Sequence, residues 1–202
     1  MCENPKTPYL ILRLKDERFM LMKADCKTYS CISCGEKRRE AHYVRIKQGA
    51  EQLAKTTKTP LCFVTLTSNK KLKTYEATRA VFPSAWKKMS MRWKRQQGGE
   101  LEYVMVYEQH KDGRLQVHMI VTCSVTKTWL KNNCVQCGFG YMVDKQQLGD
   151  EIDVSRRAGY LAKYATKSTG RTKTKKNVNY SQGYPKLIPD EYDNIEEIWR
   201  YN

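Results

Sequence analysis

The sequence contains no apolar run that approaches the ~20 residues needed for a membrane-spanning helix. Its first residues also lack the basic, apolar and small-residue regions of a secretory signal peptide. A G-x4-G-K-[ST] phosphate-binding loop is missing as well, so we expect no helicase within these residues. Together these absences predict a soluble, intracellular protein without a membrane partner.

Acidic residues are scarce relative to basic ones. The 202 residues include 37 lysines and arginines against 21 aspartates and glutamates, which gives a formal net charge of +16. A charge of this size indicates a polyanionic partner, for which nucleic acid is the most economical choice and an anionic membrane surface the alternative. Hydrophobic residues make up 40% of the chain, which is enough for the core of one domain.

The chain has eight cysteines, a number that would suit a disulfide scaffold only in a much shorter, secreted chain. We therefore expect reduced thiols and metal ligands. Two Cys-x2-Cys-Gly pairs would together supply the four thiolates of a closed structural Zn²⁺ site, and free buried thiols are the alternative. Cys26 and His42 are reserve ligands. The predicted zinc ligands are Cys31, Cys34, Cys134 and Cys137.

The stretch Leu101–Thr122 consists of two alternating apolar runs joined by a Lys-Asp-Gly turn, which predicts a β-hairpin. A three-residue loop, with Gly113 in the left-handed conformation, would place Glu108 directly opposite Gln116. His118 would then follow on the same face, because strand side chains alternate. A two-residue Asp-Gly loop would scatter these side chains, so the arrangement depends on the loop.

Glu108, Gln116 and His118, here called the hairpin triad, offer two oxygens and one imidazole nitrogen. This mostly hard ligand set suits Mg²⁺ or Mn²⁺ better than Zn²⁺. Its single formal negative charge predicts weak binding unless a phosphate supplies further oxygens. The alternative is an ordinary polar face of a half-exposed sheet. His110, close to the turn, is interpreted as a solvated histidine rather than as a fourth ligand.

Residues 61–67 are β-branched and aromatic, which predicts a central strand. The stretch Lys73–Gln97 predicts a helix that is interrupted at Pro83. Cations crowd the second half of this helix, a pattern typical either of a solvated face or of one that contacts phosphates. A Gly- and Thr-rich basic segment near residue 170 also suits backbone contacts. The candidate DNA-binding residues are Lys87, Lys88, Arg92, Arg95, Lys167 and Arg171.

Residues 152–167 predict a helix with an apolar stripe that packs on a sheet. Tyr160, Lys163 and Tyr164 fall on the adjacent face, because residues three and four apart are neighbours on a helix. A phenol can attack a phosphodiester when a metal or another cation stabilises the developing charge, and a lysine can help to hold the phosphate. The alternative is aromatic padding beside exposed lysines.

Taken in order, these segments resemble the HUH endonucleases, specifically the rolling-circle replication initiators of single-stranded DNA phages and related plasmids. The resemblance rests on E-x4-G-x2-Q-V-H from Glu108 to His118 and on four further motifs. Gln116 stands where most members have a first histidine, which keeps an oxygen ligand but alters the expected metal preference. The further motifs are F-V-T-L-T at 63–67, C-G-F-G at 137–140, Y-L-A-K-Y-A-T-K at 160–167 and N-Y-S-Q-G-Y-P at 179–185.

The resemblance implies an α+β fold, with helices packed on a five-stranded antiparallel sheet of ferredoxin-like or RRM-like type. It implies that the hairpin triad holds Mg²⁺ or Mn²⁺. Tyr160 would attack the scissile phosphate and give a 5′-phosphotyrosine and a free 3′-OH, Tyr164 would be the second nucleophile, and Lys163 occupies the family's lysine position. The implied partners are single-stranded DNA at an origin hairpin or nick site, a host polymerase and a host helicase, in the cytoplasm of a bacterial cell.

We therefore expect one HUH domain over residues 1–202. Residues 26–60 and 123–140 would contribute the Cys-rich zinc element, residues 60–186 the catalytic core, and residues 187–202 an acidic peripheral tail. The alternative function is that of a non-catalytic RRM-like or zinc-ribbon regulator, which would bind nucleic acid and use the tyrosines as stacking platforms.

Overall fold

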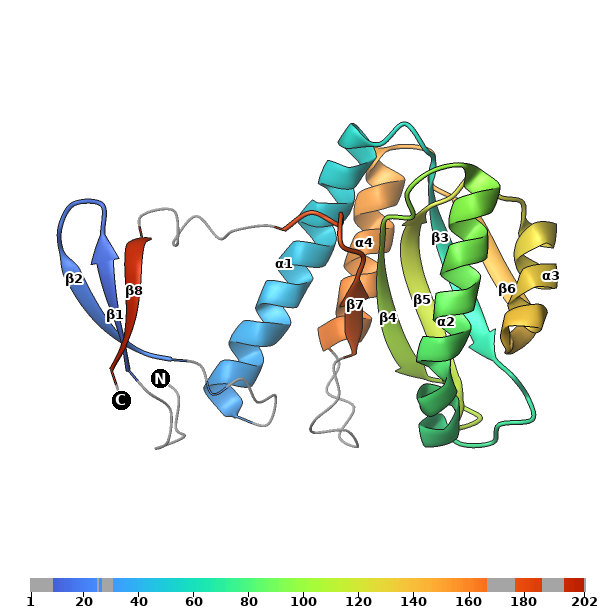
Figure 1. Ribbon diagram of the computed structural model, residues 1–202, viewed down its shortest axis with the longest axis horizontal. Coiled ribbons are helices and arrows are strands. Elements are labelled where there is room, and N and C mark those ends of the chain that lie inside the picture. The colour runs from blue at the N-terminus through green and yellow to red at the C-terminus, as the bar shows by residue number, and fades with distance from the viewer. Residues whose placement is uncertain (1–8, 25, 27–30, 167–176, 187–194, 202) are drawn as a thin grey trace.

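The computed structural model describes residues 9–24, 26, 31–166, 177–186 and 195–201. These residues form two antiparallel sheets and four helices (Figure 1). None of the described helices is both long enough and apolar enough to cross a membrane. The helices are α1 (Ile32–Thr56), α2 (Tyr75–Gln97), α3 (Lys127–Cys137) and α4 (Glu151–Thr166). The strands are β1 (Tyr9–Leu14), β2 (Phe19–Lys23), β3 (Leu61–Ser68), β4 (Tyr103–Gln109), β5 (Leu115–Thr122), β6 (Phe139–Gln147), β7 (Val178–Tyr180) and β8 (Ile195–Tyr201).

The larger sheet has five strands in the order β6-β3-β5-β4-β7, and each neighbouring pair is antiparallel. Four of these strands and two helices follow one another along the chain as β3-α2-β4-β5-α3-β6. This βαββαβ order is that of a ferredoxin-like fold. Strand β7 extends the sheet at the outer edge of β4. The predicted α+β class and the five-stranded antiparallel sheet are therefore confirmed.

Helices cover both faces of this sheet (Figure 1). Because strand side chains alternate, Val117 and Met119 of β5 lie on opposite sides of the sheet from His118 and Ile120. Val117 and Met119 join the core formed with α2 and α3. Ile120 joins the other core, which is formed with α1 and α4. The face that carries His118 is therefore the face on which α4 packs.

Helix α2 continues without a break through Pro83, so the predicted interruption was wrong. Proline removes one helical hydrogen bond. Its neighbours Phe82 and Trp86 are buried in the core, and their rings stack 6.3 Å apart. Burial of two large aromatic side chains contributes about 3 kcal/mol or more, which offsets the local cost of the proline. The hydrophobic face of the helix thus holds it together.

A second, smaller sheet has the order β2-β1-β8 and lies beyond the N-terminal end of α1 (Figure 1). Strand β8 comes from residues 187–202, which were expected to form only a peripheral tail. It pairs with β1 from Tyr9↔Tyr201 to Leu14↔Ile195. The first and last strands of the described chain therefore lie side by side, a long-range pairing that no local sequence signal predicts.

Candidate active site

The hairpin has the predicted register. Three residues separate His110 from Arg114, whose carbonyl oxygen accepts a hydrogen bond of 2.7 Å from the His110 N–H. Gly113 has φ 84° and so takes the left-handed conformation that the loop requires. As a result, Glu108 pairs directly with Gln116. The hairpin triad therefore lies on one face of the sheet, as expected.

His118 is the most enclosed member of the triad, with 6% of its surface exposed. Its Nε2 lies 3.0 Å from Glu108 Oε2, and its Nδ1 lies 3.0 Å from Thr65 Oγ1. Burial lowers the pKa of His118 below its ordinary value of 6.5, and the Glu108 carboxylate opposes part of this effect. The neutral imidazole is therefore favoured, and this is the form that binds metals.

The two tyrosines of α4 lie beside this imidazole. The Tyr160 and Tyr164 hydroxyl oxygens are 2.7 Å apart, and the two ring centroids lie 6.4 Å and 5.3 Å from that of His118. The hydrogen bond from Tyr160 is the largest cause of a raised pKa for Tyr164, followed by burial and by the charge of Glu108. Tyr160 is 38% exposed. Both predicted nucleophiles thus lie next to the hairpin triad, and one of them is open to solvent.

Packing of α4 fixes this orientation. Val154, Ala158 and Leu161 are buried in the core shared with α1 and the sheet, as the apolar stripe predicted. The Asp150 side chain accepts a 2.7 Å hydrogen bond from the N–H of Asp153 and so caps the start of the helix. With the stripe against the sheet, the adjacent helical face turns the two phenols toward the hairpin.

Arg157 is a cation beside the site that the sequence analysis missed. It lies one turn before Tyr160, and its guanidinium is 5.3 Å from the centroid of the Phe63 ring. That ring is in turn 5.9 Å from the ring of Tyr160, and an Arg157 nitrogen donates to the side chain of Gln146. The i, i+3 spacing from Tyr160 was the available signal. A guanidinium next to a candidate nucleophile suits a phosphate.

The remaining predicted residues of this helix are less well placed by the structure. Lys163 is exposed on α4, one residue before Tyr164. Lys167 and Arg171 lie outside the described residues. His110 is exposed in the hairpin turn, with its Nδ1 3.1 Å from Asp112 Oδ1, in agreement with a solvated histidine.

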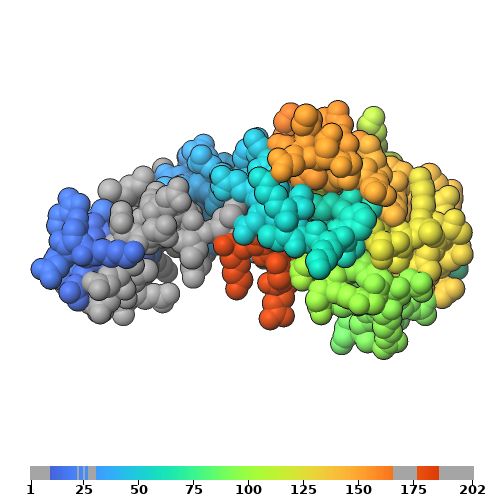
Figure 2. Space-filling view, turned by 90° about the horizontal axis from the view of Figure 1, so that it is seen from above, coloured from blue at the N-terminus to red at the C-terminus, as the bar shows by residue number. Residues whose placement is uncertain are grey.

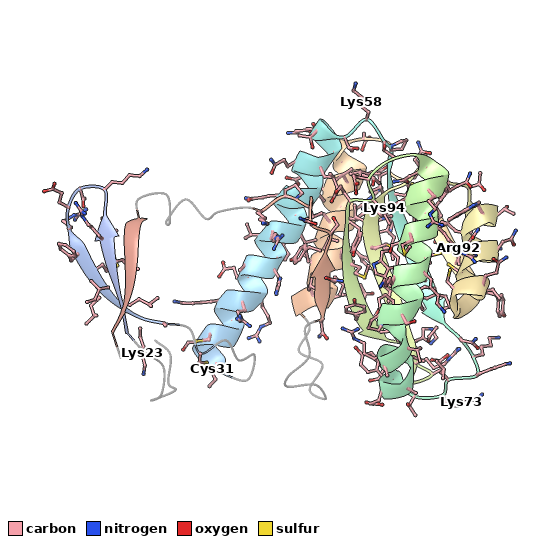
Figure 3. The ribbon with its side chains drawn as sticks, in the orientation of Figure 1. Lys23, Cys31, Lys58, Lys73, Arg92 and Lys94 are labelled. Carbon is pink, nitrogen blue, oxygen red and sulfur yellow. The ribbon has the colours of Figure 1, made fainter. Side chains whose placement is uncertain are left out.

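The structure does not bring the other predicted DNA-binding cations to the phenols. They are exposed on α2, which covers the opposite face of the sheet (Figure 3). Arg92 donates to Asn133 Oδ1 at 3.1 Å and to Gln136 Oε1 at 2.5 Å, so it ties α2 to α3. The residues concerned are Lys87, Lys88, Arg92 and Arg95.

The predicted four-thiolate zinc site is not assembled. Cys31 and Cys34 lie at the start of α1, whereas Cys134 and Cys137 are buried on α3, in the core on the other side of the sheet (Figure 1). Burial raises the pKa of Cys134 to about 12 and also raises that of Cys137. This pair therefore behaves as core thiols, because metal ligands must be thiolates. The Cys-x2-Cys spacing is local and carries no information about the partner pair.

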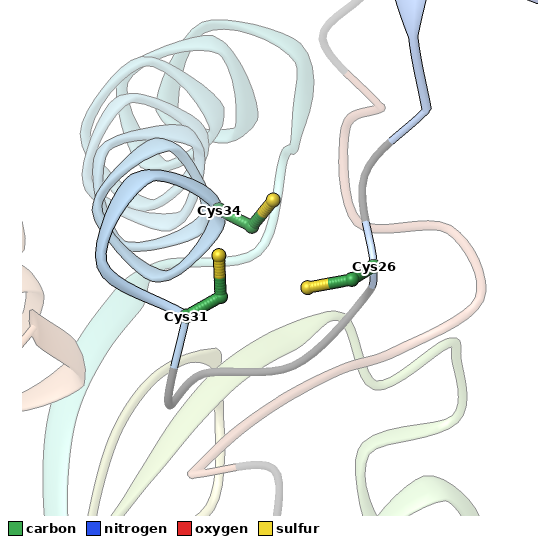
Figure 4. Close-up of side chains that lie close together, drawn as sticks. All are labelled: Cys26, Cys31 and Cys34. Carbon is green, nitrogen blue, oxygen red and sulfur yellow. The ribbon is translucent and has the colours of Figure 1, made fainter. Parts of the chain in front are cut away.

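Cys26 takes the place of the α3 pair. The sulfur atoms of Cys26, Cys31 and Cys34 all lie within 4.8 Å of one another and point toward a common space (Figure 4). His42, the other reserve ligand, instead places its Nδ1 2.9 Å from the hydroxyl of Tyr180. The three-cysteine cluster could hold a metal ion such as zinc.

Two of the shorter motifs hold the scaffold of the site together. A Cβ on Gly140 would lie 2.6 Å from the backbone oxygen of Ser68 and 2.7 Å from Thr67 Oγ1, so only glycine lets β6 approach β3 here. Tyr184 is 1% exposed and donates a 2.9 Å hydrogen bond to the Ile46 carbonyl. That contact fixes the segment after β7 to α1.

Comparison with protein-family models gives a match to the replication-associated protein ORF2 (gene 2 protein) family over residues 61–169, more than half of the chain. The matched residues include the strand with Thr65, the hairpin triad and both phenols of α4. Comparison with curated proteins gives no match, and neither does comparison with solved structures. The family implies interaction with DNA and initiation of rolling-circle replication. The resemblance stated from the motifs is confirmed, and the chain belongs to this replication-associated protein family, the rolling-circle replication initiators of single-stranded DNA phages.

Proposed function

We propose that this chain nicks and rejoins single-stranded DNA at a rolling-circle replication origin through a 5′-phosphotyrosine intermediate. One observation supports this above all: two phenols joined at 2.7 Å border an imidazole that is itself hydrogen-bonded to a carboxylate. A nucleic-acid-binding regulator would need aromatic surface for stacking. It would not need a carboxylate and an imidazole paired behind that surface.

Tyr160 acts first in this proposal. Its phenolate oxygen attacks the scissile phosphorus, a bond forms between that oxygen and phosphorus, and the bond from phosphorus to O3′ breaks. The phenolic proton is released to solvent, and the departing 3′ oxygen gains a proton to give the 3′-OH that a polymerase extends. Arg157 and Lys163 are the cations of α4 that would hold the phosphate.

The raised pKa of Tyr164 supports this order. A phenol that keeps its proton can donate a hydrogen bond to the developing phenolate of Tyr160, 2.7 Å away. Once Tyr160 is esterified to DNA, its oxygen carries no proton and the hydrogen bond that raises the pKa of Tyr164 is weakened. Tyr164 is then the nucleophile for the second cut. The 3′-OH of the displaced strand attacks the first phosphotyrosine, closes the circle and releases Tyr160.

The hairpin triad fits a divalent metal. Glu108 Oε2 and His118 Nε2 lie 3.0 Å apart, which is about the separation of adjacent ligands around an octahedral ion with bonds of ~2.1 Å. Gln116 stands directly opposite Glu108 on the neighbouring strand and adds a carboxamide oxygen. When bound, Mg²⁺ or Mn²⁺ would offset the negative charge that develops on the phosphate.

A covalent-adduct assay tests the proposal. The probe is a pool of single-stranded oligonucleotides with random centres, labelled at the 3′ end because the protein stays on the 5′ end of the downstream fragment. We expect a labelled protein band that survives denaturing electrophoresis in Mn²⁺, disappears with EDTA and is abolished in Tyr160→Phe. Tyr164→Phe should retain the first adduct but fail to rejoin strands.

Tyr141→Phe is the matched control, because Tyr141 is an equally ordinary phenol, 53% exposed on β6 and not beside the triad. It should form the adduct at the wild-type rate. Tight binding of the pool without any adduct, in the wild type and in every variant, would refute the nuclease and favour the non-catalytic regulator.

We also propose that the three-cysteine cluster holds a structural Zn²⁺. Three soft thiolates at mutual distances within 4.8 Å match a tetrahedral site, whose fourth position would be filled by another side chain or by water. Cys26 follows β2, whereas Cys31 and Cys34 open α1. A bound ion would therefore fix the small sheet to the helix that packs on α4.

Cysteine variants separate this site from the one expected from sequence. The purified chain should contain one zinc per molecule, and replacement by Co²⁺ should give a thiolate-to-metal absorption band. Cys26→Ser should weaken both signals, and Cys134→Ser, the control from the buried pair, should leave them unchanged. Equal loss in the two variants, or a chain purified without zinc that cannot take up Co²⁺, would contradict the site.

A further inference from the structure

A groove lies on the other face of the sheet, between α2 and the β4–β7 edge. Its volume is about 370 Å³, which is in the usual range of small-ligand sites. In Figure 2, residues 177–186 (red) and α2 (green) lie on the side of the molecule away from α4 (orange). The residues that line the groove are Arg79, Phe82, Pro83, Trp86, Lys87, Tyr107, Val178 and Asn179.

The groove combines aromatic rings with a flat cation. The guanidinium of Arg79 lies 3.8 Å from the centroid of the Tyr107 ring, a stacked arrangement. A guanidinium that rests on a ring with one face can stack on a nucleobase with the other. The Tyr107 hydroxyl hydrogen-bonds the side chain of Asn179, which fixes the ring that supports Arg79.

Charge in the groove has one sign. Arg79 and Lys87 are two turns apart on α2, or about 12 Å along its axis, with Pro83 between them on the same stripe. None of the described residues that line the groove is acidic. Lys87 is exposed and can reach a phosphate as a point charge. Pro83, also exposed, adds a rigid apolar wall.

We infer that this groove binds a single-stranded nucleic-acid segment separate from the one at the phenols, with a base on Arg79 and a phosphate at Lys87. The inference explains why the basic residues of α2 lie on the sheet face opposite the hairpin triad. It does not depend on cleavage. One strand can then contact both faces, at the nick site near α4 and at a flanking segment along α2.

The test uses fluorescence anisotropy with labelled oligo(dT) of twenty nucleotides, over a range of KCl, without divalent metal and in a Tyr160→Phe, Tyr164→Phe background. Lys87→Ala should lower the salt slope of log K by ~0.7, the value for one phosphate contact on a single strand. Arg79→Lys keeps the charge, so the slope should stay the same while affinity falls about fivefold or more through lost stacking.

Lys58→Ala is the charge-matched control, because Lys58 is exposed in the loop before β3, far from the groove (Figure 3). Circular dichroism checks that each variant is folded. Equal slopes for Lys87→Ala and Lys58→Ala, or unchanged affinity in Arg79→Lys, would overturn the inference. So would displacement of the oligonucleotide by polyglutamate at equal charge concentration. Adduct formation by groove variants that retain both tyrosines distinguishes a failed groove from a failed nuclease.

Discussion

Replacing Thr65 by valine is the sharpest test of how the site is built. The hydroxyl lies 3.0 Å from His118 Nδ1, while Nε2 lies 3.0 Å from Glu108. For Nε2 to bind a metal, Nδ1 must carry the proton, which Thr65 Oγ1 then accepts. A hydroxyl both donates and accepts, so threonine serves either tautomer of the imidazole. Valine has nearly the same shape and a higher strand preference but cannot do so.

The expected effect follows from burial. Because His118 is 6% exposed, water does not readily replace the lost partner. An orphaned buried donor costs about 1–3 kcal/mol, and loss of an outer partner of a metal ligand typically weakens metal binding about 10- to 100-fold. Titration of Mn²⁺ by electron paramagnetic resonance measures this directly. Thr65→Ser keeps the hydroxyl and should bind Mn²⁺ nearly as well as the wild type. Wild-type Mn²⁺ affinity in Thr65→Val would refute the reasoning.

Three further changes have defined outcomes. Gly140→Ala should destabilise the chain by about 1–3 kcal/mol in urea unfolding, because its Cβ meets the Ser68 backbone at 2.6 Å; Gly99→Ala, with nothing within 4 Å, should not, and equal losses would contradict the close approach. Burial raises the pKa of Tyr184 above 10.0; above that pH the unfolded chain binds fewer protons than the folded one, so the free energy of unfolding should fall as pH rises, and less so in Tyr184→Phe. An identical alkaline profile in that variant would count against the assignment. In the metal-free chain, iodoacetamide should modify Cys26 faster than Cys134, whose pKa burial raises to about 12; mass spectrometry of the digested protein measures the order, and faster labelling of Cys134 would show that α3 opens.

The local parts of this fold could be predicted because local rules decide them. A Lys-Asp-Gly loop with Gly113 at positive φ sets the register, and the register alone puts Glu108 opposite Gln116. Spacing on one helix likewise places Tyr160 beside Tyr164. In each case the interacting residues are close in the sequence, and one turn or one helical period relates them.

What failed depends on contacts between distant segments. Cys31 and Cys134 carry the same local signature, yet they lie on opposite sides of the sheet, because that placement is set by strand order and not by spacing. The same holds for Thr65, which reaches His118 only because β3 pairs with β5 in register. Pro83 failed for another reason, since burial of its neighbours outweighs a local propensity.

The substitution of an amide for a histidine in the hairpin triad has a mechanistic consequence. With Gln116 in that place, the site offers one carboxylate and one imidazole, and these are bonded to each other at 3.0 Å. An ion must displace that bond and gains only one formal charge in return, so binding of the ion alone is weak. A scissile phosphate adds further oxygens and negative charge on the same side as the phenols. Metal and DNA should therefore bind cooperatively, which restricts the assembled site to moments when a strand lies beside Tyr160.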